Sequence, residues 1–207
     1  MLIKLRAKPF DITIIQTYLP TTDSSDEDIE SHYEELQSII RNHVKSTEEL
    51  IIMGDFNAKV GEGKEGDIAG QYGLGERNER GERVIQFCTE NQLAISNTYF
   101  QKPARKLYTW KSPGDWCRNQ IDYILIRKRF RNSIKNCQTY PGADINSDHN
   151  PVIANVKLNL KVIKKPQHDK KIDLNALKTS SELQDKYKIA VHNRYEALEV
   201  ENRIQYE

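Results

Sequence analysis

The first hydrophobic segment of the chain runs from Ile12 to Tyr18, is rich in β-branched and aromatic residues, and ends just before Pro20. This composition predicts a β-strand, because such side chains pack well on a pleated surface. A helix is expected to follow, since Ser25 with Asp28 three positions later resembles a capping box. Apolar residues then recur at helical spacing on one face, at Ile29, Tyr33, Leu36, Ile40 and Val44.

A second strand is expected at Leu50 to Met53, a short continuous apolar run of the kind found in strands buried on both faces. Six of the ten glycines then fall in residues 61–75, which predicts a long irregular loop. A helix is expected from Glu82 to Asn91. Short strands are predicted at 93–98, 107–111, 121–126, 134–140 and 152–158. The alternation of strands and helices predicts an α/β fold.

The character of the chain changes at Lys161. Five lysines surround Pro166 between residues 161 and 171, and helical spacing of apolar residues resumes after Ser181 with no strand to follow. We therefore expect residues 1–160 to form the folded domain. Residues 161–207 are expected to form a basic linker and a C-terminal helix.

Charge is almost balanced over the whole chain, with 31 Lys and Arg against 30 Asp and Glu. It is unevenly distributed, however. Residues 101–135 carry ten bases and two acids, interleaved with Tyr108, Trp110, Trp116, Tyr123 and Phe130. A polyanion would be attracted to such a segment, although a solvated surface above core aromatics is the ordinary interpretation of a basic cluster.

Targeting signals and cysteines add little to this picture. No run of about 18 apolar residues occurs, and the start of the chain lacks the apolar region of a signal peptide. Cys88, Cys117 and Cys137 are an odd number without C-x-x-C spacing, which favours reduced thiols. These features predict an intracellular protein that does not associate with membranes.

Candidate chemistry lies in three short stretches at the ends or starts of apolar strands. They are Gly54-Asp55-Phe56-Asn57, Gln120-Ile121-Asp122-Tyr123 and Ser147-Asp148-His149-Asn150-Pro151. Each stretch alone is weak evidence for catalysis, because an Asp after a strand is more often a turn former than a catalyst. Together they supply a base, a metal-binding carboxylate and a hydrogen-bonding imidazole and amide, which a phosphodiester hydrolase needs.

These stretches, with Tyr18-Leu19-Pro20 before them, resemble in order and spacing the endonuclease/exonuclease/phosphatase superfamily over about residues 10–157. Within it, Arg118 to Leu125 followed by a basic segment resembles the endonuclease domain of LINE-type retrotransposons. The tail around Tyr195 resembles the linker that leads to the reverse transcriptase domain in such elements. The resemblance implies a two-sheet α/β sandwich with flanking helices.

The resemblance also implies roles for individual residues. His149 matches the histidine that faces the scissile phosphate, and Asp122 matches the acid that orients its ring. Asp55 matches the acid that aligns or deprotonates the attacking water. Asn57 matches a donor to that water or to a phosphate oxygen, and Tyr18 matches a phenol that hydrogen-bonds the phosphate.

A divalent cation and DNA are implied as well. Asp148 matches a carboxylate at the metal and, with His149, is the predicted ligand pair for Mg²⁺ or Mn²⁺. No small-molecule cofactor is expected. DNA is the expected partner, which favours a nuclear location, and the reverse transcriptase domain is the expected partner in the parent element. The candidate nucleic-acid contacts are Arg105, Lys106, Trp110, Arg118 and Asn119.

The chain departs from the superfamily pattern before Tyr18. Members carry an Asn and a metal-binding Glu on strands before this motif, whereas residues 1–11 contain neither. We therefore expect the first strands of the sandwich to be missing, one sheet edge to be exposed and catalysis to be impaired. Two alternatives remain open: a non-catalytic remnant that binds nucleic acid or protein, and a phosphatase, against which the basic segment argues.

Overall fold

The computed structural model describes residues 1–21, 23–143, 145–161 and 174–204. The chain divides into two compact units, Met1–Ile163 and Lys164–Glu207. The second unit contains the helices α3 (Leu174–Thr179) and α4 (Ser181–Ile204). The lysine-rich stretch predicted as a linker lies largely outside the described residues. In the part of the chain that is described, no helix has the length and apolar character needed to cross a bilayer.

A five-stranded mixed sheet forms the centre of the first unit, in the order β1-β2-β3-β7-β4. Its strands are β1 (Leu2–Leu5), β2 (Ile12–Tyr18), β3 (Glu49–Asp55), β4 (Leu93–Ile95) and β7 (Asp122–Arg127). β2 and β3 are parallel, and the other pairs are antiparallel. A second sheet pairs β8 (Ile134–Thr139) with β9 (Val152–Val156), and a short hairpin pairs β5 (Trp110–Lys111) with β6 (Arg118–Asn119).

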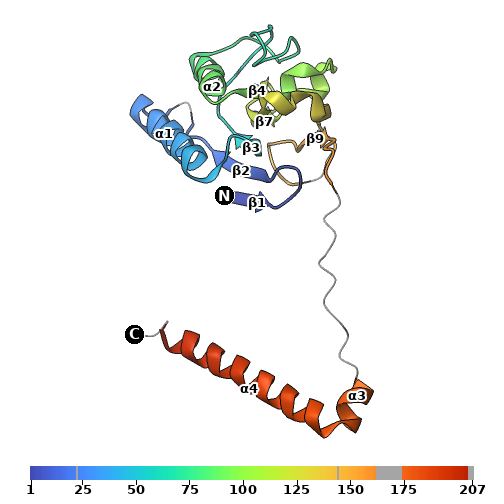
Figure 1. The fold of residues 1–207 in the computed structure, drawn as a ribbon. Helices are drawn as coiled ribbons and strands as arrows, with labels where there is room; N and C mark the ends of the chain where they lie inside the picture. Colours follow the sequence, from blue (N-terminus) through green and yellow to red (C-terminus); the bar gives the residue numbers. More distant parts are fainter. Residues whose placement is uncertain (22, 144, 162–173, 205–207) are drawn as a thin grey trace. The chain divides into compact units, whose positions relative to one another are not determined.

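The two faces of the central sheet are covered differently. Helices α1 (Asp26–His43) and α2 (Glu79–Glu90) lie on one side of the strands and β9 on the other (Figure 1). On the helical side, Tyr33 and Phe87 pack into the main core with Leu50, Ile52 and Leu125. On the opposite side, a smaller core joins the central sheet to the second sheet and contains Ala94, Ile126 and Ile134. The predicted two-sheet α/β fold with flanking helices is thus confirmed.

Local sequence signals explain the well-predicted elements. The Ser25 hydroxyl accepts a hydrogen bond from the Asp28 N–H at 3.1 Å and caps α1, as its sequence indicated. Val44 stands just after the helix, where it still packs against the core.

Other boundaries differ from the prediction. Helix α2 begins three residues early because Asn78 caps it. The predicted strand over 93–98 stops at Ile95, where the 3₁₀ helix η1 (Ser96–Tyr99) begins.

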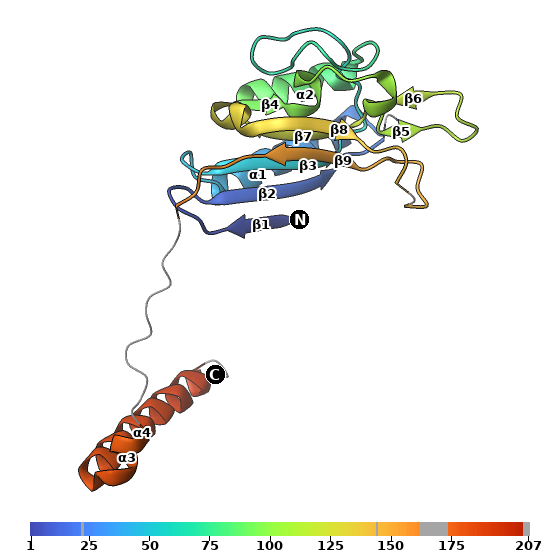
Figure 2. The same ribbon diagram turned by 90° about the vertical axis from the view of Figure 1, so that its right-hand side faces the viewer.

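The ends of the fold also depart from the prediction. The short strand β1 was not predicted, because a segment of only four residues carries too little periodicity to identify a strand. It forms one edge of the central sheet, with Leu2, Ile3 and Leu5 between 38% and 47% exposed. Figure 2 shows the β5–β6 hairpin extending from the body of the unit near β8 and β9.

Gly81 provides a test of this packing. Alanine there should favour a helix by about 1 kcal/mol on propensity alone. A Cβ at this position would overlap the main-chain carbonyl of Lys59, which cannot move freely because Lys59 and Asn78 are joined by hydrogen bonds in both directions. We expect Gly81→Ala to lower the free energy of unfolding by roughly 2 kcal/mol, as overpacking does. Urea denaturation measures this.

The control for this substitution is Gln86→Ala on the exposed face of α2, which should change stability by less than about 0.5 kcal/mol. An increase in stability for Gly81→Ala would contradict the close approach of α2 to Lys59.

Candidate active site

Strand register gathers the predicted acids at one edge of the central sheet. Tyr18 at the end of β2 is paired with Asp55 at the end of β3, and Asp55 is paired with Asp122 at the start of β7. His149 comes from the segment before β9 and forms an isolated bridge with Trp110. Four stretches that are distant in sequence therefore meet at one place.

The shortest contacts at this place involve His149. Its Nδ1 lies 3.0 Å from Asp122 Oδ2, and its Nε2 lies 4.0 Å from Asp55 Oδ2. Because Asp122 holds one ring nitrogen, the other is directed towards Asp55. The three side chains thus form a continuous row from Asp122 through the imidazole to Asp55.

Asp55 is the most enclosed member of the row, with 9% of its surface exposed. Burial raises the pKa of its carboxyl above the ordinary value, and the nearby charges of Asp122 and Asp148 act in the same direction. The Asn57 main-chain N–H opposes this shift by donating to Asp55 Oδ1 at 2.8 Å. A carboxylate with a raised pKa is a stronger base than an exposed one.

Asn57 has a backbone φ of 46°, in the left-handed region that Asn adopts more readily than most residues. Its side-chain amide donates to Leu19 O at 2.8 Å. One amide hydrogen is therefore engaged with the main chain, and the other remains to serve as the predicted donor.

A cleft of about 520 Å³ is lined by two members of this row, Asp55 and His149. Seven of the residues predicted from sequence line it: Tyr18, Asp55, Asn57, Trp110, Asn119, Asp148 and His149. Tyr18 is 65% exposed, so its hydroxyl is accessible. Lys59 and Asn78 also line the cleft, and no sequence pattern had singled them out.

Asp148 and Trp110 are joined directly. The Trp110 indole N–H donates to Asp148 Oδ2 at 2.8 Å and holds the pKa of Asp148 below its ordinary value. The indole nitrogen of Trp110, a candidate nucleic-acid contact, is thus engaged inside the site. Asp148 and Trp110 remain together on the cleft wall.

The other candidate nucleic-acid contacts are more dispersed. Arg118 forms a two-pronged ion pair with Asp115, with Nε 2.6 Å from Oδ1, and stacks over Tyr108. Arg105 and Lys106 lie in the 3₁₀ helix η2 (Ala104–Lys106). These three bases are not among the described residues that line the cleft.

Two buried side chains that sequence analysis missed hold the row in place. The Thr109 hydroxyl accepts hydrogen bonds from the N–H groups of both Ile121 and Asp122, at 2.9 and 3.0 Å. The Asn97 amide donates to Asp122 O and accepts from Ile124 N. Their sequence contexts carry no signal for this, because the bonds join residues 12 to 27 positions apart.

Asp55, Asp122 and His149 are also close enough to hold a metal ion, since one ligand atom from each lies within 4.8 Å of the others. Two carboxylates and an imidazole suit a divalent cation that takes its remaining ligands from water and substrate. Of the predicted ligand pair, His149 belongs to this group. Asp148 lies outside it, next to Trp110.

The fold and this acidic cluster define the class of protein: a hydrolase-like fold of the endonuclease/exonuclease/phosphatase superfamily. The chain belongs to the endonuclease-reverse transcriptase family, whose model matches residues 12–153.

Similar proteins agree with this placement. The chain is 46% identical over 163 residues to craniofacial development protein 2 of Bos taurus and 45% identical to that of Tragulus javanicus. The matches cover 79% of this chain and 27% and 28% of those proteins, so the chain spans about a quarter of their length.

Solved structures share the fold at low identity. The endonuclease domain of TRAS1, a telomere-specific non-LTR retrotransposon, matches with a TM-score of 0.53 at 20% identity, over 76% of this chain and 63% of that one. An AP endonuclease from Archaeoglobus fulgidus matches with a TM-score of 0.54 at 17% identity, over 76% and 65% of the two chains. The Xenopus laevis APE2 catalytic domain matches with a TM-score of 0.53 at 20% identity, over 79% and 56%.

Proposed function

We propose that this chain is a metal-dependent phosphodiester hydrolase that nicks DNA, of the kind found in LINE-type retrotransposons. The observation that carries the proposal is the row of Asp122, His149 and Asp55, of which His149 and Asp55 line an open cleft. The family match and the similarity in fold to a retrotransposon endonuclease support it.

The proposed reaction is attack of water on phosphorus. Asp55 accepts a proton from the water, helped by the burial that raises its pKa. His149, held by Asp122, presents its Nε2 towards the phosphate. The Tyr18 hydroxyl and the free amide hydrogen of Asn57 donate to phosphate oxygens, whose negative charge increases in the transition state.

The proposed cofactor is Mg²⁺ or Mn²⁺. Asp55, Asp122 and His149 would hold it, and the predicted ligand Asp148 lies on the wall of the same cleft. Such a cation, when bound, would stabilise negative charge on the phosphate. We propose that its binding is weak, because His149 already engages Asp122 and Trp110 already engages Asp148.

Because these contacts already occupy His149 and Asp148, they also favour a second candidate function, a domain that binds nucleic acid without cutting it. The basic segment no longer argues strongly against a phosphatase, since its bases do not form one surface beside the cleft. The proposal includes DNA as the partner and a nuclear location for the protein. It also includes a reverse transcriptase domain as the partner in the parent element.

Nicking of supercoiled plasmid separates these functions. We expect the 207-residue chain to nick slowly in Mg²⁺ or Mn²⁺ and not in EDTA. A form extended upstream, with the additional acidic ligand that the resemblance implies, should nick on the order of tenfold faster or more.

Three other results would contradict parts of the proposal. Plasmid binding without nicking by both forms would support the non-catalytic function. Nicking that persists in EDTA would contradict the metal requirement. Faster release of phosphate from a 3′-phosphorylated oligonucleotide than nicking would support a phosphatase.

A further inference from the structure

The basic segment 101–135 does not form a single surface. Strand β7 crosses the central sheet from Asp122, in the candidate active site, to Arg127. Five residue steps of ~3.3 Å place these two ends about 17 Å apart. Half of the ten bases, those from Arg127 to Lys135, therefore follow the end of the strand that is remote from the candidate active site.

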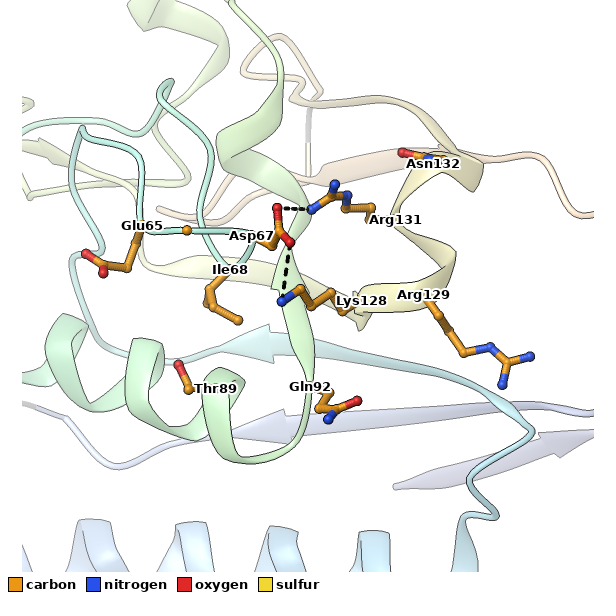
Figure 3. A pocket seen from close by; sticks show the side chains of 10 residues that line it. Glu65, Asp67, Ile68, Thr89, Gln92, Lys128, Arg129, Arg131 and Asn132 are labelled. Carbon is orange, nitrogen blue, oxygen red and sulfur yellow. Dashed lines mark ion pairs between the residues drawn. The ribbon is translucent and has the colours of Figure 1, made fainter.

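Two of these five bases, Lys128 and Arg131, are paired with a carboxylate. Figure 3 shows Asp67 between Lys128 and Arg131, with which it forms ion pairs of 3.4 and 2.5 Å. Arg127 donates to Ser46 O at 3.3 Å. The contacts of Asp67 fix the glycine-rich loop against the end of the sheet. Arg129 and Lys135 donate instead to main-chain oxygens, those of Ser46 and Asn132, and form no ion pair among the described residues.

Arg129 and Lys135 meet a third base, Lys157, in a groove of about 470 Å³. Phe10 and Phe130 form part of its wall, and the described residues that line it include no acid. In Figure 3 the Arg129 side chain points away from Asp67. The groove therefore concentrates positive charge beside two aromatic rings.

The Arg129 guanidinium is held in position before any ligand binds. It lies 4.6 Å from the centroid of the Phe130 ring, and its Nη1 reaches Ser46 O at 3.5 Å. The Phe10 ring packs against the Phe130 ring, and their centroids lie 4.7 Å apart. A planar guanidinium fixed on a ring loses little entropy when it forms a two-pronged contact with a phosphate.

Positive charge continues beyond the groove. The main-chain N–H of Lys161 donates to Lys8 O at 2.7 Å. Lys161 follows two residues after Asn159, which lines the groove, so Lys8 and Lys161 add two lysines to this part of the chain. The sequence then continues into the stretch with five lysines between 161 and 171.

We infer that the groove formed by Arg129, Lys135 and Lys157 binds the phosphate backbone of a single-stranded nucleic acid, separately from the cleft at His149. Single strands use cations beside aromatic rings, because unpaired bases can stack while phosphates are neutralised. Arg129 covers the Phe130 ring, so Phe10, which lines the groove, is the ring that a base would contact. An acidic protein would use the charges but would have less use for the rings. This inference goes beyond the proposed nicking activity and does not depend on it.

Fluorescence anisotropy with a labelled 20-nucleotide oligo-dT in EDTA tests this inference. We expect Arg129→Glu/Lys135→Glu/Lys157→Glu to weaken binding by about tenfold or more. The slope of the logarithm of the binding constant against the logarithm of the salt concentration should become shallower by about two, since each phosphate contact on a single strand contributes roughly 0.7 to it. Lys135→Gln/Lys157→Gln, which disturbs the fold less, should weaken binding by about threefold or more.

The matched control reverses the same number of charges elsewhere. Lys186→Glu/Lys188→Glu/Arg194→Glu changes three exposed residues of α4 and should weaken binding by less than about twofold.

Two results would overturn the inference: an equal loss in the α4 control, or equally tight binding of a 20-residue oligoglutamate through the same three bases. Failure of the chain to nick plasmid would bear only on the proposed function.

Discussion

Replacing His149 by alanine is expected to slow plasmid nicking on the order of 10²-fold or more, the usual scale for a positioned acid-base or charge-stabilising group. The imidazole is the member of the row that contacts Asp122 and faces Asp55. Its removal leaves the Asp122 carboxylate without its ring partner and the cleft without the group directed at the phosphate. Asp55→Ala should cause a loss of similar size. The upstream-extended form gives a rate high enough to measure these losses.

The control for this substitution is His32→Ala, which removes a half-buried histidine of α1 whose Nδ1 lies 2.9 Å from Asp28 O in the same helix. Nicking by that variant should be unchanged. The double variant Asp122→Asn/His149→Ala should be little slower than His149→Ala alone, because residues that act as a unit are not additive. Full additivity, or a loss of less than about threefold for His149→Ala, would contradict the proposed role of the row.

The second large effect concerns stability and originates at Glu49 in β3. Both carboxylate oxygens of Glu49 are buried and have no hydrogen-bond partner among the described residues. Burial raises its pKa to about 8, although Arg127 and Arg129 act in the opposite direction. The folded protein therefore keeps a proton on Glu49 at pH values where the unfolded chain has lost it. Stability should fall as pH rises from about 4.5 to about 8.

Glu49→Gln should remove this part of the pH dependence and stabilise the protein at pH 8 by roughly 3–5 kcal/mol, since each pKa unit corresponds to about 1.4 kcal/mol. Urea denaturation at pH 5, 6.5 and 8 measures the change. Equal effects of the substitution at pH 5 and pH 8 would show that Glu49 does not carry a raised pKa.

Glu48→Gln is the control of opposite sign. Burial alone would raise the pKa of Glu48, but hydrogen bonds from the Lys4 ammonium at 2.7 Å and the Thr13 hydroxyl at 3.1 Å outweigh it and hold that pKa below the ordinary value. A carboxyl of this kind stabilises the folded state above its ordinary pKa of 4.5. Glu48→Gln should therefore reduce stability at pH 6.5 and 8.

Elements formed by local interactions could be predicted from the sequence. The strand at Ile12–Tyr18, the helix capped by Ser25 and the strand that ends at Asp55 follow from short-range periodicity and capping, which neighbouring residues determine. The motifs around Asp55, Asp122 and His149 could be selected as candidate chemistry for the same reason. Each is a compact group of reactive side chains beside an apolar strand.

Contacts between distant segments could not be predicted in this way. In the sequence, residues 101–135 form one basic segment that either attracts a polyanion or is an ordinary solvated surface, whereas in the structure β7 separates its two halves. Trp110 stays a candidate nucleic-acid contact, and only the structure shows that its indole N–H bonds Asp148. No local pattern in the sequence marks Thr109 and Asn97, which hold Asp122 in place.

The sequence by itself determined the α/β class, the main helices and strands and the reactive residues, because propensity, capping and periodicity act over a few positions. Only the tertiary structure decided which of those residues meet. The register of β2, β3 and β7 brings Tyr18, Asp55 and Asp122 side by side. The isolated bridge between Trp110 and His149 then holds His149 beside them. Register depends on how whole faces of the sheet pack, so a shift of one residue would turn these side chains to the opposite face.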